Sequence, residues 1–83
     1  MHKTFTETGW EHYVYWQNQD RKTLNKINRL LQSVERDGAM NGEGKPERLK
    51  YECGYSRRID DANRLVYDIE DNIIVIKGCR GHY

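Results

Sequence analysis

Polar side chains in three parts of this 83-residue chain could act together on a phosphodiester. Glu47 follows a Gly-Lys-Pro segment, and His82 is the next-to-last residue. Arg58 and Arg64 lie between them. A carboxylate can take the proton from a ribose 2′-hydroxyl, fixed guanidinium groups can hold the phosphate, and an imidazolium can protonate the leaving 5′-oxygen. These residue types predict cleavage of RNA that needs no metal ion or other cofactor.

The spacing of the arginines favours a joint role. If the Asp-Asp-Ala segment after Ile59 is a three-residue hairpin loop, Arg58 lies opposite Arg64 on one face of a sheet. Two cations directly opposite each other destabilise a sheet unless an anion lies between them. Arg57 points to the other face in this register, where we expect its guanidinium to extend over the helices into water.

The other candidates raise geometric questions. Glu47 and Lys50 are three residues apart, so a regular strand would place them on opposite faces. They can share a site only if the strand begins irregularly or Lys50 reaches around its edge. His82 would share a face with Ile76 and Arg80 if the last strand stayed extended to the end. We expect no functional role for the remaining histidines, because His2 lies next to the start of the chain and His12 lies on the polar side of a helix.

Two helices should precede the strands. Residues 2–6 could form a short strand, after which Thr6 or Thr8 caps a helix. Its inward stripe is predicted to comprise Trp10, Tyr13, Val14 and Gln17. Asp20 should cap a second helix that Gly38 ends. The inner face of that helix is predicted to comprise Leu24, Ile27, Leu30, Leu31 and Val34.

Strands are predicted after a loop at residues 38–46, which holds three glycines and the only proline. Four runs, 48–51, 55–59, 63–69 and 73–77, have the spacing of an antiparallel meander. In the third run Leu65, Tyr67 and Ile69 should face the helices. We therefore expect an α+β fold in a single domain over residues 1–83, with a helical hairpin packed on a mainly antiparallel sheet of four to five strands.

The charge pattern fits a polyanionic partner. The formal net charge is only +1, but residues 21–50 carry eight Lys and Arg against four Asp and Glu. A solvated helix face explains the cations of the second helix equally well. Two cysteines are too few for a disulfide framework and show no metal-ligand spacing. Without a signal pattern or an apolar run of membrane length, a cytoplasmic protein away from the membrane is expected.

The segments together resemble the YoeB/Txe toxins of bacterial toxin-antitoxin modules, which are related to RelE. The resemblance runs almost end to end, and its order and spacing are more specific than any single motif. It is carried by Trp10, Tyr13, Tyr15-Trp16-Gln17, Asp20, Lys26-Ile27-Asn28, Gly44-Lys45-Pro46-Glu47, Leu49-Lys50, Ser56-Arg57-Arg58-Ile59, Arg64-Leu65-Val66-Tyr67, Cys79-Arg80 and His82-Tyr83.

The resemblance implies a RelE-like fold and a metal-independent endoribonuclease that cuts mRNA in the A site of the 70S ribosome. It also implies a homodimer and a YefM/Axe-like antitoxin that covers the cationic face. By position, the implied roles are Glu47 as general base, His82 as general acid, Arg58 and Arg64 as phosphate-stabilising arginines, Lys50 as the active-site lysine and Tyr83 as the terminal tyrosine that shapes the site.

The chain departs from the family pattern in three places. The segment between Lys50 and Ser56 is short and keeps one aromatic, Tyr55, as a candidate for stacking on an mRNA base. Asn63 replaces a frequent histidine, and Gly81 replaces a frequent tyrosine. Two other functions remain open: a ParE-like inhibitor of DNA gyrase, which would lack the acid and base, and a non-catalytic RNA or ribosome binder, which would tolerate loss of the general base.

Overall fold

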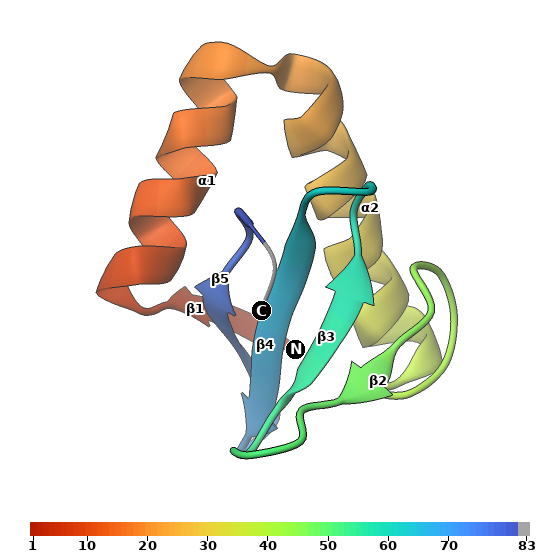
Figure 1. Cartoon of the computed structure of the whole chain (residues 1–83). Helices are drawn as coiled ribbons and strands as arrows, with labels where there is room; N and C mark the ends of the chain where they lie inside the picture. The colour runs from red at the N-terminus through yellow and green to blue at the C-terminus, as the bar shows by residue number, and fades with distance from the viewer. Residues whose placement is uncertain (82–83) are drawn as a thin grey trace.

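The computed structural model describes residues 1–81. In chain order its elements are β1 (His2–Phe5), α1 (Glu7–Gln19), α2 (Arg21–Asp37), β2 (Glu47–Arg48), β3 (Tyr55–Arg58), β4 (Arg64–Glu70) and β5 (Ile73–Gly78). The strands form one sheet with the order β1-β5-β4-β3-β2 (Figure 1). β1 runs parallel to β5, whereas the other neighbouring strands are antiparallel. The predicted α+β fold with a mainly antiparallel sheet is confirmed.

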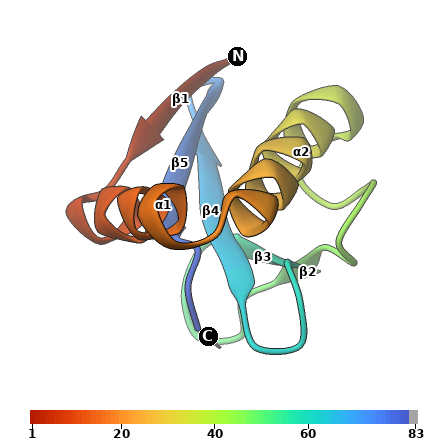
Figure 2. The ribbon, with the colours of Figure 1, turned by 90° about the horizontal axis from the view of Figure 1, so that it is seen from above.

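Polar caps set the helix boundaries as the sequence predicted. The Thr6 hydroxyl accepts a hydrogen bond from the Gly9 amide, 3.0 Å away, and begins α1. The Asp20 carboxylate accepts from the first free amides of α2, and Gly38 ends that helix with a φ of 96°. The two helices meet at Asp20 and diverge from there (Figure 1). Viewed from above, α1 lies near the edge of the sheet that β1 and β5 form, whereas α2 lies toward the edge that β3 and β2 form (Figure 2).

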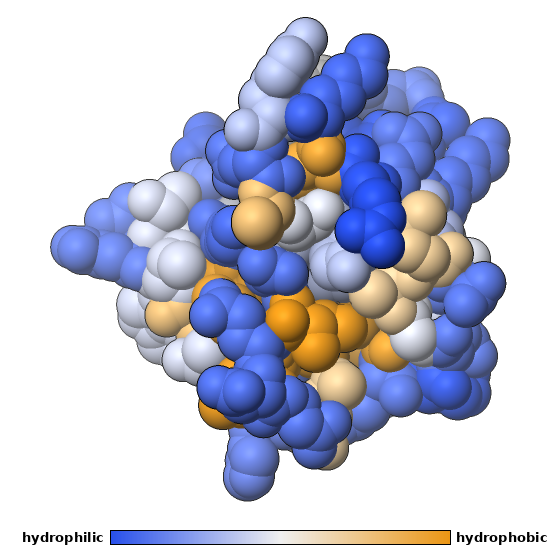
Figure 3. Space-filling model, turned by 90° about the horizontal axis from the view of Figure 1, so that it is seen from below, coloured by the Kyte–Doolittle hydropathy of each residue, from blue (hydrophilic) through white to orange (hydrophobic). Residues whose placement is uncertain are grey.

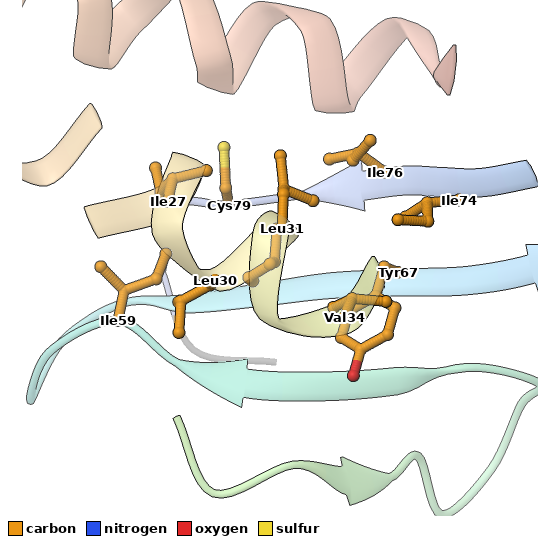
Figure 4. Packing of buried hydrophobic residues seen from close by; sticks show 10 residues of the cluster. Ile27, Leu30, Leu31, Val34, Ile59, Tyr67, Ile74, Ile76 and Cys79 are labelled. Carbon is orange, nitrogen blue, oxygen red and sulfur yellow. The ribbon is translucent and has the colours of Figure 1, made fainter. Parts of the chain in front are cut away.

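The core lies between α2 and the sheet. Every predicted inward residue of α2 is buried, and Leu65 and Tyr67 of β4 are buried opposite them. Figure 4 shows side chains of α2 packed against Tyr67 and against Ile74 and Ile76 of β5; those from α2 are Ile27, Leu30, Leu31 and Val34. Figure 3 shows the opposite end of the molecule from the helix connection, where hydrophilic residues surround an apolar area. The period-2 pattern of β4 therefore identified the covered face of the sheet.

The predicted stripe of α1 is partly wrong. Trp10 is 53% exposed and Gln17 is also exposed, whereas Gly9 is buried. A Cβ at Gly9 would lie 2.2 Å from the Ile76 carbonyl oxygen, so the helix crosses β5 at this glycine. Trp16 donates its indole N–H to the Cys79 carbonyl at 2.8 Å. The helix is rotated relative to the prediction because close backbone approach at a glycine fixes which face is inside.

The predicted strand at 48–51 is also wrong in extent. β2 covers only Glu47–Arg48, where Glu47 pairs with Ser56. The Leu49 amide then donates to the Gly54 carbonyl, 3.0 Å away, and residues 50–53 bend away from the strand direction. Gly54 has a φ of 125°, which only glycine adopts without strain. The chain therefore leaves the sheet directly after Arg48.

Arg57 is completely buried, so the prediction that its guanidinium extends into water is wrong. Its Nε donates to the Tyr67 hydroxyl at 2.9 Å and Nη1 donates to the Ser33 hydroxyl at 2.9 Å. The remaining N–H groups donate to the carbonyls of Glu43, Gly38 and Asn41 at 2.6 to 2.8 Å. All five N–H groups of the guanidinium are used. Arg57 therefore holds the loop that leads into Glu47.

Candidate active site

The β3-β4 hairpin places its arginines as the sequence predicted. Arg58 is paired with Arg64, and the Ile59 amide donates to the Asn63 carbonyl at 3.0 Å. Their surroundings differ, however. The Arg58 side chain is 43% exposed and forms an ion pair with Asp61. Arg64 is only 20% exposed, and its Nε donates to the Ser56 hydroxyl at 3.2 Å. The Asp61 carboxylate therefore offsets part of the repulsion between the guanidinium groups of Arg58 and Arg64.

Arg64 has an unused hydrogen-bond donor. Its Nη2 lies 3.9 Å from a carboxylate oxygen of Glu47, which is an ion pair but too long for a hydrogen bond. Within residues 1–81 this nitrogen is the buried side-chain polar atom that has no hydrogen-bond partner. A buried cationic N–H without an acceptor is costly, and an anionic oxygen placed beside it would satisfy it.

A groove of about 550 Å³ lies in front of Arg64. Glu47 and Ser56 line it from the sheet, and Lys50 lines it from the bend after β2. The early end of β2 answers the question raised by the spacing of Glu47 and Lys50, because the bend returns Lys50 to the side of Glu47. The other lining residues are Arg48, Leu49, Tyr51 and Glu52.

Tyr55 lies away from this groove. It packs against the core, where its ring stacks on Tyr67 with centroids 5.6 Å apart, and the Arg48 guanidinium lies 5.4 Å from its ring centroid. A stacking role for Tyr55 on RNA stays a prediction. Tyr51, which the sequence reasoning did not select, lines the groove and is 97% exposed. Its position in a Gly-containing loop beside Lys50 was the available signal.

A second hollow of about 310 Å³ adjoins the first, since Arg64 and Glu52 line both. Thr6, Thr8 and His12 contribute from the start of α1, and Lys77, Gly78, Arg80 and Gly81 contribute from the end of the chain. Val66 completes the lining. The second hollow thus connects the arginine of the groove with the segment that leads to His82.

His12 faces this hollow rather than the polar side of α1, which corrects the prediction. Its Nδ1 accepts a hydrogen bond from the Cys79 amide at 3.0 Å. Burial is the main cause that lowers the pKa of His12, the charge of Arg80 lowers it further, and Glu11 acts in the opposite direction. A neutral imidazole is required here, because Nδ1 can accept only while it carries no proton.

His82 and Tyr83 lie outside the described residues. β5 ends at Gly78, and Gly81 has a φ of 88°, so the chain does not stay extended as far as the prediction assumed. The Gly81 carbonyl accepts from the Arg64 amide at 3.1 Å. Arg80 lies over the ring of Tyr15, with its guanidinium carbon 3.6 Å from the centroid. The Gly81 carbonyl, in the residue directly before His82, is therefore hydrogen-bonded to the backbone of Arg64.

Residues 1–81 offer neither a metal site nor a membrane-spanning helix. No group of three or more His, Cys, Asp and Glu in this range is arranged to hold a metal ion. Neither α1 nor α2 has the length and apolar character needed to cross a membrane.

A sequence profile of the YoeB-like toxin of bacterial type II toxin-antitoxin systems matches residues 5–83. Toxin YoeB of Streptomyces coelicolor is 52% identical over the full length of both chains.

Two solved structures from Staphylococcus aureus are similar at 47% identity, and the match covers 100% of this chain and 98% of each of those chains. One is a YoeB dimer, with a TM-score of 0.94, and the other is a heterotetrameric YoeB-YefM toxin-antitoxin complex, with a TM-score of 0.92. The RelE-like fold implied by the resemblance is confirmed.

Proposed function

This chain belongs to the YoeB toxins of bacterial type II toxin-antitoxin systems, and we propose that it is a metal-independent endoribonuclease acting on mRNA in the ribosomal A site. The observation that carries the proposal is the buried Nη2 of Arg64, which lies 3.9 Å from the Glu47 carboxylate and has no hydrogen-bond partner among residues 1–81. A phosphate oxygen would satisfy this donor, and the neighbouring Glu47 carboxylate would serve as the general base.

The proposed reaction is attack by a ribose 2′-oxygen on the adjacent phosphorus. Glu47 accepts the proton of the 2′-hydroxyl while the bond from the 2′-oxygen to phosphorus forms. The bond from phosphorus to the 5′-oxygen breaks, and His82 gives its proton to that oxygen. The products are a 2′,3′-cyclic phosphate and a 5′-hydroxyl. Glu47 is 68% exposed in the open groove, so a 2′-hydroxyl can reach it directly.

The cations have unequal roles in this proposal. Arg64 stabilises the charge that develops on the phosphate, because its guanidinium is held by Ser56 and the adjoining backbone by Gly81. Lys50 lines the same groove and adds positive charge beside the phosphate. Arg58 is half-exposed and shared with Asp61, so it acts at longer range. We assign Tyr83 the role of shaping the site around His82.

Partners follow from the relatives. The Staphylococcus aureus toxin forms a dimer and a complex with YefM. We extend both properties to this chain, which would then form a homodimer and be neutralised by a YefM/Axe-like antitoxin. The ribosome is the second proposed partner, and the cytoplasm, where translation takes place, is the proposed location. A net charge of +1 makes the chain a weak binder of free RNA, so the ribosome would present the substrate.

The test compares ribosome-bound and protein-free mRNA. The purified chain should cut a reporter mRNA within the A-site codon of stalled ribosomes and leave the same mRNA intact when ribosomes are omitted at physiological salt. Efficient cleavage of the protein-free RNA would contradict ribosome dependence. Arrest of translation without any cut would refute the nuclease and favour a non-catalytic ribosome binder.

A further inference from the structure

Four hydrogen bonds hold the segment between β5 and His82, although this segment lies outside the sheet. The Cys79 amide donates to His12 Nδ1 at 3.0 Å, and the Cys79 carbonyl accepts from Trp16 Nε1 at 2.8 Å. The Gly81 amide donates to Asn63 Oδ1 at 2.8 Å, and the Gly81 carbonyl accepts from the Arg64 amide at 3.1 Å. The backbone N–H and the carbonyl oxygen of Cys79 and of Gly81 are thus all hydrogen-bonded. We call His12, Trp16 and Asn63 the tail clamp.

We propose that His12 and Asn63 are positioning residues, which support the proposed proton donor His82 by fixing the backbone of Cys79 and Gly81 in the segment that precedes it. The proposal rests on the nuclease function proposed above. Neither residue touches the reacting phosphate in this account. Their contribution is geometric, since a displacement of about 1 Å in a reacting group can cost roughly 100-fold in rate.

Asn63 suits this task because both ends of its amide are bonded. Oδ1 accepts from Gly81, while Nδ2 donates to the Asp60 carboxylate at 3.0 and 3.2 Å. Asp60 also accepts from the amides of Ala62 and Asn63, so the hairpin loop fixes the asparagine. The side chain therefore links the loop between the two arginines to the residue before His82.

His12 gives the clamp a dependence on pH. Protonation of Nδ1 removes the acceptor for the Cys79 amide. The charged groups around it are Glu11 on α1, Arg80 at the end of the chain, and Lys77, Glu52 and Arg64 across the second hollow. Because the pKa of His12 is lowered from 6.5 by burial and Arg80, the bond is complete above pH 6.5 and is lost as the pH falls through the lowered pKa.

The experiment compares His12→Asn with His12→Leu. The Asn carbonyl oxygen can accept from the Cys79 amide at every pH, whereas Leu cannot accept at all. His2→Asn, at an exposed position of β1, is the matched control. Single-turnover cleavage of ribosome-bound mRNA is recorded between about pH 5 and 8. The amide NMR signals of Cys79 and Gly81 are followed down to about pH 4, because the pKa of His12 is lowered from that of an ordinary histidine.

The proposal predicts that His12→Leu lowers the maximal single-turnover rate about 10- to 100-fold without weakening ribosome binding, and that His12→Asn restores most of the loss. The Cys79 amide should titrate with His12 in the wild type and not in His12→Asn. Equal rates in His12→Leu and the wild type would overturn the proposal, as would Gly81 signals that His12→Leu leaves unchanged. If the wild type cuts no mRNA, the nuclease proposal fails, while the NMR titration still decides whether the clamp exists.

Discussion

Replacement of Arg57 by lysine tests how the loop before Glu47 is held. The guanidinium makes five hydrogen bonds, and three of them go to carbonyls of the 38–43 segment. Lysine has three N–H donors on one atom and cannot reach acceptors that are spread around the edge of the planar guanidinium group. At least two charge-assisted hydrogen bonds are lost, each contributing roughly 1.5 to 3 kcal/mol.

Some of that loss is recovered, because loop carbonyls freed near the surface can bind water. We therefore expect Arg57→Lys to lower the free energy of unfolding by about 2 to 4 kcal/mol. A chain of this length has only about 4 to 12 kcal/mol in total. Urea unfolding followed by tryptophan fluorescence measures the change. Arg29→Lys is the control, since Arg29 is 60% exposed and should shift stability by less than about 0.5 kcal/mol. An Arg57→Lys midpoint equal to that of the control would refute the reasoning.

Three other predictions follow from individual contacts. Burial raises the pKa of the Cys79 thiol to about 12, so a thiol reagent at pH 8 should label only Cys53 in the native chain and both cysteines in urea, as mass spectrometry would show. Gly9→Ala should destabilise the fold by about 1 to 3 kcal/mol in thermal unfolding, because the new Cβ would meet the Ile76 carbonyl; an unchanged melting temperature would contradict this packing. Arg64→Lys should slow single-turnover mRNA cleavage about 100-fold and Arg58→Lys less than about 10-fold, because Arg58 is shared with Asp61; equal losses would contradict their assigned roles.

Local chemistry made much of the fold predictable from sequence. Asp20 and Gly38 identified the ends of α2, since capping depends on a side-chain oxygen and on a glycine dihedral that neighbouring residues do not alter. The three-residue loop after Ile59 gave the pairing of Arg58 with Arg64, because loop length fixes the register of a hairpin.

Features that depend on contacts between distant segments were not predictable. The face of α1 was misjudged because Gly9 packs against β5, and this orientation of the helix turns the large apolar side chain of Trp10 toward solvent. Arg57 is buried because its acceptors come from α2, the following loop and β4, which no pattern in sequence brings together. His12 was assigned to the polar side of its helix, although the end of β5 lies beside it. The early end of β2 at Arg48 has a local cause instead: the Leu49 amide bonds to the Gly54 carbonyl, and the alternation of residue types at 48–51 does not reveal this turn.

The central claim is that Glu47 activates the 2′-hydroxyl beside Arg64. The most direct measurement is the single-turnover cleavage rate of ribosome-bound mRNA by Glu47→Ala, with Glu43→Ala, at an exposed loop position, as the matched control. We predict that Glu47→Ala lowers the rate by about 10² to 10⁴ while ribosome binding and the melting temperature stay unchanged, and that wild-type products end in a cyclic or 3′-phosphate. A Glu47→Ala rate equal to that of Glu43→Ala, or products with a free 3′-hydroxyl, would contradict the account.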